Sequence, residues 1–124
     1  MQTALQVAGL QSAQINYVNT HGTSSPLGDQ TEVAALKALG LGHAPLNATK
    51  ALTGHTLTAA GVVEAVATLL QMQAGQLHPT RNLHRPIDPT LPWVGEKAVA
   101  AQVDYALSNS FGFGGINATL IFGR

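Results

Sequence analysis

The segment that decides the fold is residues 53–75, TGHTLTAAGVVEAVATLLQMQAG. It predicts a helix from about Thr56 to Ala74, and Gly75 follows where a glycine commonly ends a helix. The apolar residues of this segment leave almost no polar face, and a helix that is apolar all round is normally buried. We therefore expect a helix in the interior of a layered fold, between sheets or against another subunit.

Strand patterns and helical patterns alternate on both sides of this segment. Helices are expected at residues 3–8 and 27–39, and strands at residues 15–19, 45–48, 103–109 and 116–122. Such alternation is typical of an α/β fold. A short glycine-rich link joins the last two strands, so we expect these two strands to pair antiparallel.

The composition limits the kinds of protein that this chain can be. Its 124 residues suffice for one domain, and only 10% of them are charged, against about 25% in typical globular chains. Either much of the surface faces other protein, or uncharged polar side chains solvate an Ala/Gly-rich domain. Six basic and six acidic residues give zero net charge, so nothing points to nucleic acid or an anionic membrane.

The absence of cysteine excludes disulfides and thiol catalysis by this chain alone. We expect no metal site, because carboxylates are scarce and no His-x-x-x-His pair is present. The N-terminus lacks a signal-peptide pattern, and the strongly apolar stretch 57–70 is too short to span a bilayer. A cytoplasmic location without membrane contact is therefore expected.

Two of the five histidines lie where α/β proteins place their functional sites. His21 follows a predicted strand and opens a Gly/Ser/Thr loop, and His55 opens the long helix. The positive end of a helix dipole disfavours protonation of a nearby histidine, and a neutral imidazole can donate one N–H to an oxyanion. The alternative is a pair of structural loop histidines. The other three, His43, His78 and His84, are expected to be ordinary solvated residues.

Lys50 lies between a predicted strand and the His55 turn, in a largely apolar neighbourhood. Burying an unpaired ammonium group is costly, so a carboxylate partner is expected, and Glu32 is the best candidate. The alternative places both side chains in solvent.

Residues 111–115 are glycine-rich but do not match a phosphate-binding loop. The glycines would let the backbone approach a ligand, with Phe113 as a mobile apolar gate. The alternative is a tight hairpin turn with two packed aromatic rings.

Taken together, these segments resemble one enzyme family. Residues 18–29 (VNTHGTSSPLGD), 49–61 (TKALTGHTLTAAG), 79–83 (PTRNL) and 109–117 (NSFGFGGIN) resemble motifs in the C-terminal half of elongating β-ketoacyl-[acyl carrier protein] synthases, including those of fatty-acid and polyketide synthesis. The motifs occur in the family's order, and the resemblance covers essentially the whole chain.

This resemblance implies a thiolase-like fold, in which two similar halves pack their sheets around buried central helices. His21 and His55 would donate hydrogen bonds to the thioester carbonyl of malonyl-carrier protein and stabilise the enolate formed as carbon dioxide leaves. Lys50 would hold the His21 side of the site through Glu32. The resemblance also implies supporting roles for Thr23 in the first motif and for Phe113, Gly114 and Gly115 in a gating loop.

The resemblance further implies a decarboxylative Claisen condensation with no cofactor beyond the phosphopantetheine arm of the carrier. The expected partners are acyl carrier protein and an N-terminal half that bears the cysteine nucleophile, in a dimer of full units. Initiating synthases have Asn in place of one of these histidines, and chain-length factors usually lose catalytic residues, so the catalytic, elongating type fits better. The alternatives are a non-catalytic scaffold subunit and an inactive fragment.

Overall fold

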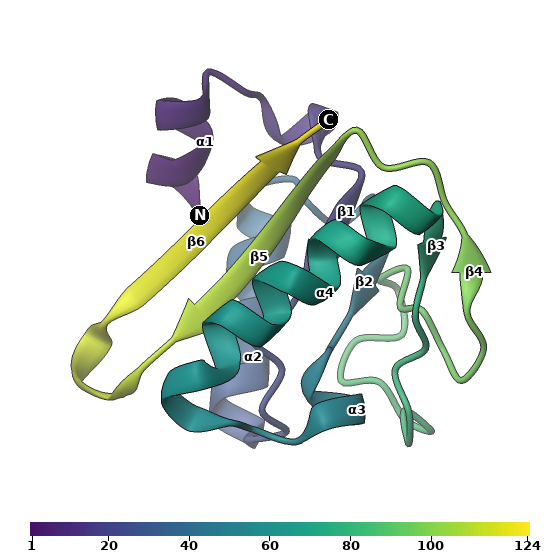
Figure 1. Ribbon diagram of the computed structural model, residues 1–124. Coiled ribbons are helices and arrows are strands. Elements are labelled where there is room, and N and C mark those ends of the chain that lie inside the picture. The colour runs from purple at the N-terminus through teal and green to yellow at the C-terminus, as the bar shows by residue number, and fades with distance from the viewer.

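The computed structural model describes all residues 1–124, and helices cover both faces of its four-stranded main sheet (Figure 1). The helices are α1 (Gln2–Ala8), α2 (Pro26–Ala38), α3 (Lys50–Thr53) and α4 (Ala60–Ala74). The strands are β1 (Tyr17–Asn19), β2 (Leu46–Asn47), β3 (Gln76–Leu77), β4 (Val99–Ala100), β5 (Tyr105–Phe111) and β6 (Asn117–Gly123). The α/β class is confirmed, and the segment between β2 and α4 contains the short helix α3.

The main sheet has the strand order β2-β1-β5-β6. β1 runs parallel to both β2 and β5, whereas β5 and β6 form the expected antiparallel hairpin. β3 and β4 form a separate two-stranded ribbon. Because the carboxyl ends of parallel strands lie at one edge of a sheet, the loops that follow β1 and β2 meet there.

Each face of the sheet has its own core, and adjacent strand residues point to opposite cores. Val18 and Leu107 belong to the core under α1 and α2, whereas Tyr17 and Ala106 belong to the core under α4. This alternation follows from the two-residue period of a strand. It also directs the next polar residues of β1 and β5 to defined faces of the sheet.

Helix α4 turns its polar side chains inward, contrary to the expectation of burial all round. Glu64, Thr68 and Gln71 are buried against the sheet. On the opposite side, Val62 is 69% exposed and Leu70 is 58% exposed. The sheet covers only one side of the helix, so this chain leaves an apolar face without a cover.

Residues Leu57–Ala74 are long and apolar enough to cross a membrane by length and composition alone, with a mean hydropathy of 1.3 over 18 residues. The expectation that this region is too short considered only residues 57–70. Glu64 lies inside this window and is 1% exposed, packed against the sheet. A glutamate is almost never fully buried unless it is paired, so this side chain needs a partner inside the fold.

A closed ring of hydrogen bonds joins α4 to the sheet. Tyr17 donates from its hydroxyl to Asn47 Oδ1 at 2.5 Å, Asn47 Nδ2 donates to Gln71 Oε1 at 2.8 Å, and Gln71 Nε2 donates to the Tyr17 hydroxyl at 2.9 Å. Burial raises the pKa of Tyr17 well above its ordinary value, so the phenol stays a donor. Each member of the ring satisfies a buried polar group that would otherwise be costly.

We expect Tyr17→Phe to lower the free energy of unfolding by about 1–3 kcal/mol, because it leaves Asn47 Oδ1 and one Gln71 amide proton without a partner. Urea denaturation measures this loss. Tyr105→Phe is the matched control, since the Tyr105 hydroxyl makes no hydrogen bond, and it should change stability far less. Equal effects of the two changes would contradict the importance of the ring.

Candidate active site

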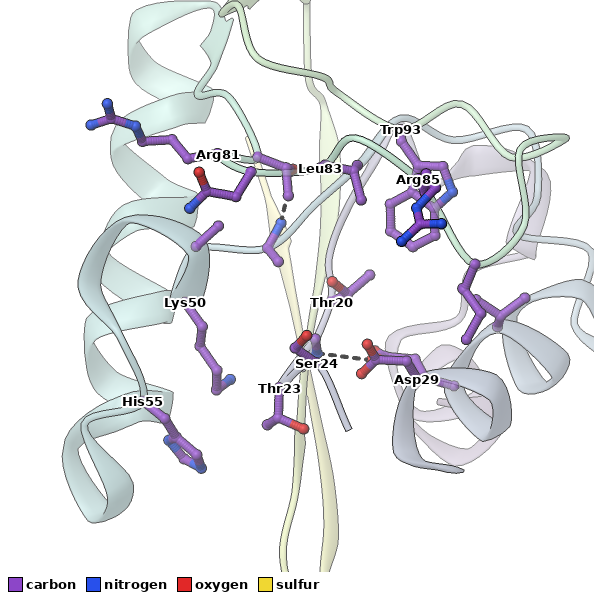
Figure 2. A pocket seen from close by; sticks show the side chains of 18 of the residues that line it. Thr20, Thr23, Ser24, Asp29, Lys50, His55, Arg81, Leu83, Arg85 and Trp93 are labelled. Carbon is purple, nitrogen blue, oxygen red and sulfur yellow. Dashed lines mark hydrogen bonds between the residues drawn. The ribbon is translucent and has the colours of Figure 1, made fainter. Parts of the chain in front are cut away.

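A cavity of about 540 Å³ opens beside the carboxyl ends of β1 and β2 (Figure 2). Lys50 and His55 lie along one side of it, and Asp29 lies on the opposite side. Thr23 also lines the cavity, and its hydroxyl lies 3.2 Å from the Ser25 hydroxyl. The loop after β3 contributes Arg81, so the cavity combines polar and cationic side chains.

The two predicted histidines meet beside this cavity, which His55 lines. The ring centroids of His21 and His55 are 5.7 Å apart, and their planes are perpendicular. The meeting follows from the parallel pairing of β1 with β2, in which Asn19 and Asn47 are register partners. The sequence placed His21 after a strand and His55 at the start of the long helix, and the topology brings together β1 and β2, which precede them.

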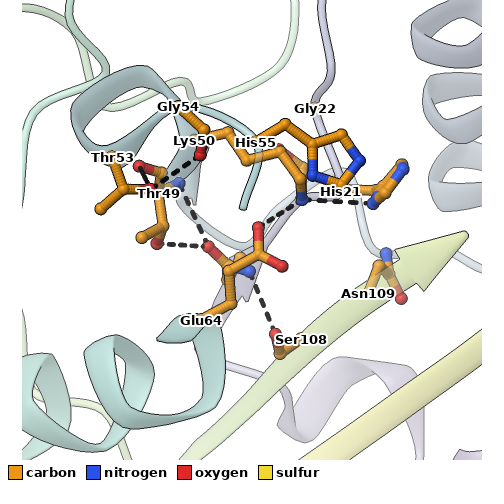
Figure 3. A network of polar contacts seen from close by, with 12 residues as sticks. His21, Gly22, Thr49, Lys50, Thr53, Gly54, His55, Glu64, Ser108 and Asn109 are labelled. Atoms are coloured by element: carbon orange, nitrogen blue, oxygen red, sulfur yellow. Dashed lines mark hydrogen bonds and ion pairs between the residues drawn. The ribbon is translucent and has the colours of Figure 1, made fainter. Parts of the chain in front are cut away.

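Lys50 fixes the tautomer of His21 (Figure 3). Lys50 Nζ lies 3.2 Å from His21 Nδ1. An ammonium group can only donate, so Nδ1 accepts and the ring proton of neutral His21 lies on Nε2. Burial, followed by the electrostatic effects of nearby Lys50 and His55, lowers the pKa of His21 to about 4. The imidazole is neutral near pH 7 as expected, but the cause is burial and Lys50 and not a helix dipole.

The backbone fixes the tautomer of His55 in the same sense. The Leu57 N–H donates to His55 Nδ1 at 3.2 Å, which leaves the ring proton of neutral His55 on Nε2. Gly54 precedes the histidine with φ of 71° and ψ of −179°, a conformation that favours glycine. Neither His21 nor His55 uses its Nε2–H in a hydrogen bond within the chain. With both rings in the neutral form, the site offers two Nε2–H donors from adjacent rings.

The expected ion pair between Lys50 and Glu32 is wrong. Lys50 Nζ lies 2.5 Å from Glu64 Oε1, and the two side chains are 5% and 1% exposed. Glu64 is the single acidic residue of α4 and was the available signal for this pair. The prediction missed this carboxylate because it expected the helix to be apolar on every side.

Glu32 has a different role, on the α2 side of the sheet. Its carboxylate accepts the backbone N–H groups of His21 at 2.9 Å and Gly22 at 3.1 Å, and the side-chain amide of Asn109 at 2.9 Å. Burial raises the pKa of Glu32 in spite of these hydrogen bonds. Gly22 has φ of 45°, and a Cβ there would lie 2.8 Å from the Thr20 hydroxyl. The loop is thus held by its backbone, with the His21 ring directed towards Lys50.

The glycine-rich loop contributes a different aromatic residue from the expected one. The Phe111 ring lies 5.5 Å from the His21 ring, centroid to centroid. Phe113 is fully exposed in the hairpin loop, and Gly114 and Gly115 have φ of 78° and 80°. The sequence motif contains both phenylalanines, and no signal distinguished the one that contacts the histidine. The gating role of Phe113 stays a prediction.

His78 is not the solvated residue that the sequence suggested. It is half-buried, and its Nε2 lies 3.0 Å from the Thr49 hydroxyl. His43 is exposed but bonded to the carbonyls of Ile15 and Gly40, and exposed His84 pairs with Glu96 at 3.4 Å. No group of three His, Asp or Glu side chains is arranged to hold a metal ion.

We expect Glu64→Ala to destabilise the protein by about 3–5 kcal/mol, because it leaves the buried Lys50 ammonium unpaired. Urea denaturation measures this loss. The double variant Lys50→Met with Glu64→Leu removes both charges and should recover most of the stability. An unchanged free energy of unfolding in Glu64→Ala would contradict the buried ion pair.

We expect His21 to titrate near pH 4 in an NMR titration of the imidazole. Because the folded pKa lies below the unfolded value of about 6.5, the unfolded chain binds more protons between these values. The contribution of His21 to stability is therefore complete above pH 6.5 and is lost as the pH falls towards 4. Lys50→Met should raise the His21 pKa, and an unchanged midpoint would contradict the contact.

Comparison with known proteins places this arrangement in one family. The family described as Beta-ketoacyl synthase, C-terminal domain, matches residues 1–84. The chain is 50% identical over 120 residues to the polyketide biosynthesis malonyl-ACP decarboxylase PksF of Bacillus subtilis, covering 97% of this chain and 29% of that protein. It is 47% identical over 125 residues to 3-oxoacyl-[acyl-carrier-protein] synthase 2 of Synechocystis, covering 96% of this chain and 30% of that protein.

A solved structure agrees with these relatives. The type II polyketide ketosynthase of the AntDE:AntF complex, solved with its acyl carrier protein, superimposes with a TM-score of 0.89 at 33% identity, over 97% of this chain and 30% of that one. The chain thus spans about three tenths of the proteins it resembles. The thiolase-like fold expected from the motifs is confirmed, and the chain belongs to the C-terminal domain of the β-ketoacyl synthases, in the thiolase superfamily.

Proposed function

We propose that this chain supplies the decarboxylating part of a β-ketoacyl-ACP synthase, which joins malonyl-ACP to an acyl thioester in fatty-acid or polyketide synthesis. The observation that carries the proposal is the pair of Nε2–H groups on His21 and His55. Both Nδ1 atoms accept from neighbouring donors, so each neutral ring keeps its N–H on Nε2, and the two rings are adjacent.

Two such donors suit an oxygen atom that gains charge during a reaction. The malonyl thioester carbonyl would accept from both Nε2–H groups. As the carboxylate leaves as carbon dioxide, the electrons of the broken C–C bond move into an enolate whose oxygen these hydrogen bonds stabilise. Lys50 keeps the His21 ring neutral and oriented, and Glu64 balances the buried charge of Lys50.

Condensation needs a nucleophile that this chain lacks, since it contains no cysteine. In the proposed reaction a cysteine of the N-terminal half carries the acyl group as a thioester. The enolate carbon attacks that thioester, the new C–C bond forms, and the thiolate leaves. The exposed apolar side of α4 supports such a partner, because Val62, Val66 and Leu70 are between 51% and 69% exposed.

Acyl carrier protein is the proposed donor of the malonyl group, on a phosphopantetheine arm that reaches the cavity. The ketosynthase of the similar AntDE:AntF complex supports this partner, since it was solved with its carrier protein. We infer no metal and no other cofactor in the reaction. A dimer of complete units and a cytoplasmic location belong to the same proposal.

A second candidate function is decarboxylation of malonyl-ACP without condensation. It is favoured by the 50% identity to a protein named a malonyl-ACP decarboxylase, and the residues of this chain serve that step alone. Product analysis of the assembled enzyme with malonyl-carrier protein and an acyl primer separates the two. A β-ketoacyl product supports the synthase, acetyl-carrier protein alone supports the decarboxylase, and no carbon dioxide release leaves the non-catalytic scaffold or inactive fragment.

We expect His55→Ala in the assembled enzyme to reduce carbon dioxide release from malonyl-carrier protein by about 10²–10³-fold, the loss typical of one oxyanion donor. His84→Ala is the control, since His84 lies outside the cavity lining, and it should leave the rate unchanged. Retained decarboxylation in His55→Ala would exclude the assigned role.

A further inference from the structure

We propose that His78 is a positioning residue for Lys50, acting through a relay of hydrogen bonds from His78 through Thr49 to Asn19. The inference rests on the proposed function, because Lys50 matters to the reaction through its contact with His21. Three side chains form the relay: His78 after β3, Thr49 before α3, and Asn19 at the end of β1.

The direction of every hydrogen bond in the relay follows from one backbone group. The Thr49 N–H can only donate, and it points at Asn19 Oδ1 at 3.3 Å. This contact identifies that atom of the amide as the oxygen and therefore as an acceptor. The Thr49 hydroxyl lies 2.7 Å from the same oxygen and must donate its single proton to it. The amide nitrogen of Asn19 faces the Ser108 hydroxyl at 3.0 Å, which is consistent with this orientation.

The hydroxyl of Thr49 consequently has only lone pairs left for His78. Because His78 Nε2 lies 3.0 Å from that hydroxyl, Nε2 must carry a proton and donate it. The other ring nitrogen is not constrained in this way. Nδ1 lies 2.9 Å from the Pro79 carbonyl, which accepts, and 3.3 Å from Asn47 Nδ2, which donates. Gain or loss of a proton at Nδ1 therefore leaves the relay intact.

The main chain of His78 is held independently of its ring. Its N–H donates to Gln71 Oε1 at 2.9 Å, and its carbonyl accepts from Asn47 Nδ2 at 3.0 Å. The backbone of His78 is thus fixed by Asn47 and Gln71, two members of the buried hydrogen-bonded ring. A side chain on so fixed a backbone can set the position of what it contacts.

Thr49 passes this position on to Lys50. The Thr49 carbonyl accepts the N–H groups of Leu52 at 2.9 Å and Thr53 at 3.2 Å, which begins α3. Lys50 is the first residue of α3, and its ammonium reaches both His21 and Glu64. Release of Thr49 would let α3 shift and lengthen the contact between Lys50 and His21.

The first test needs no activity. ¹⁵N NMR of the imidazoles in the assembled protein should show His78 protonated at Nε2 throughout pH 5 to 9. A neutral ring protonated at Nδ1 would overturn the relay. In His78→Ala the ring nitrogen signal of His21 should move, because the Lys50 contact changes, whereas in His84→Gln it should not. An unmoved His21 signal in His78→Ala would overturn the positioning role.

The second test is kinetic, on carbon dioxide release from malonyl-carrier protein. His78→Ala should lower kcat about three- to tenfold with KM nearly unchanged, the effect of one lost hydrogen bond. His78→Gln, which keeps an N–H donor at the place of Nε2, should restore kcat to within about twofold of the native enzyme. Equal losses in the Ala and Gln variants would contradict a role as donor.

Thr49→Val, which removes the receiving hydroxyl, completes a double-mutant cycle. Its effect and that of His78→Ala should not multiply in the double variant, because both break the same relay. Multiplying effects would overturn the inference. If the native enzyme releases no carbon dioxide, the proposed function fails, and the two NMR measurements alone decide the role of His78.

Discussion

The buried ion pair between Lys50 and Glu64 is the constraint on which the rest of the structure depends. Two charges that are 5% and 1% exposed are tolerated only when each stays beside the other. Glu64 must therefore face the sheet, and the rotation of α4 about its axis is fixed. Thr68 and Gln71, one and two turns further on, are carried inward with it, and the apolar side is turned outward.

In the neutral form both histidines carry their proton on Nε2, but different donors impose this tautomer. Lys50 occupies Nδ1 of His21 with a charged donor, and the backbone of Leu57 occupies Nδ1 of His55 with a neutral one. In each ring the remaining proton lies on Nε2. The charged donor also opposes protonation of His21, so one lysine sets the tautomer and supports the neutral state together. The Leu57 N–H is neutral, so the donor to His55 needs no carboxylate partner of the kind that Glu64 provides for Lys50.

The sequence predicted the fold class, the antiparallel hairpin and a common location for His21 and His55, because these depend on local pattern and motif order. It did not predict the partner of Lys50, since Glu32 and Glu64 are both carboxylates at plausible separations and only the sheet decides their sides. Hydropathy could not orient α4, because a helix that is apolar on most sides has no clear buried face. The burial of His78 was not predicted, because its ring contacts Thr49 and Asn47, which are distant in sequence.

The same orientation of α4 links the site to whatever covers its outer side. Glu64 and the exposed Val66 lie half a turn apart on α4, so the ion pair and the uncovered apolar face belong to opposite sides of one helix. A protein surface that buries the apolar side would also remove water from around α4 and strengthen the field of the buried charges. In the proposed assembly, the part that supplies the cysteine would cover the helix whose Glu64 holds Lys50. In that assembly, the contact with the partner and the position of Lys50 would both depend on α4.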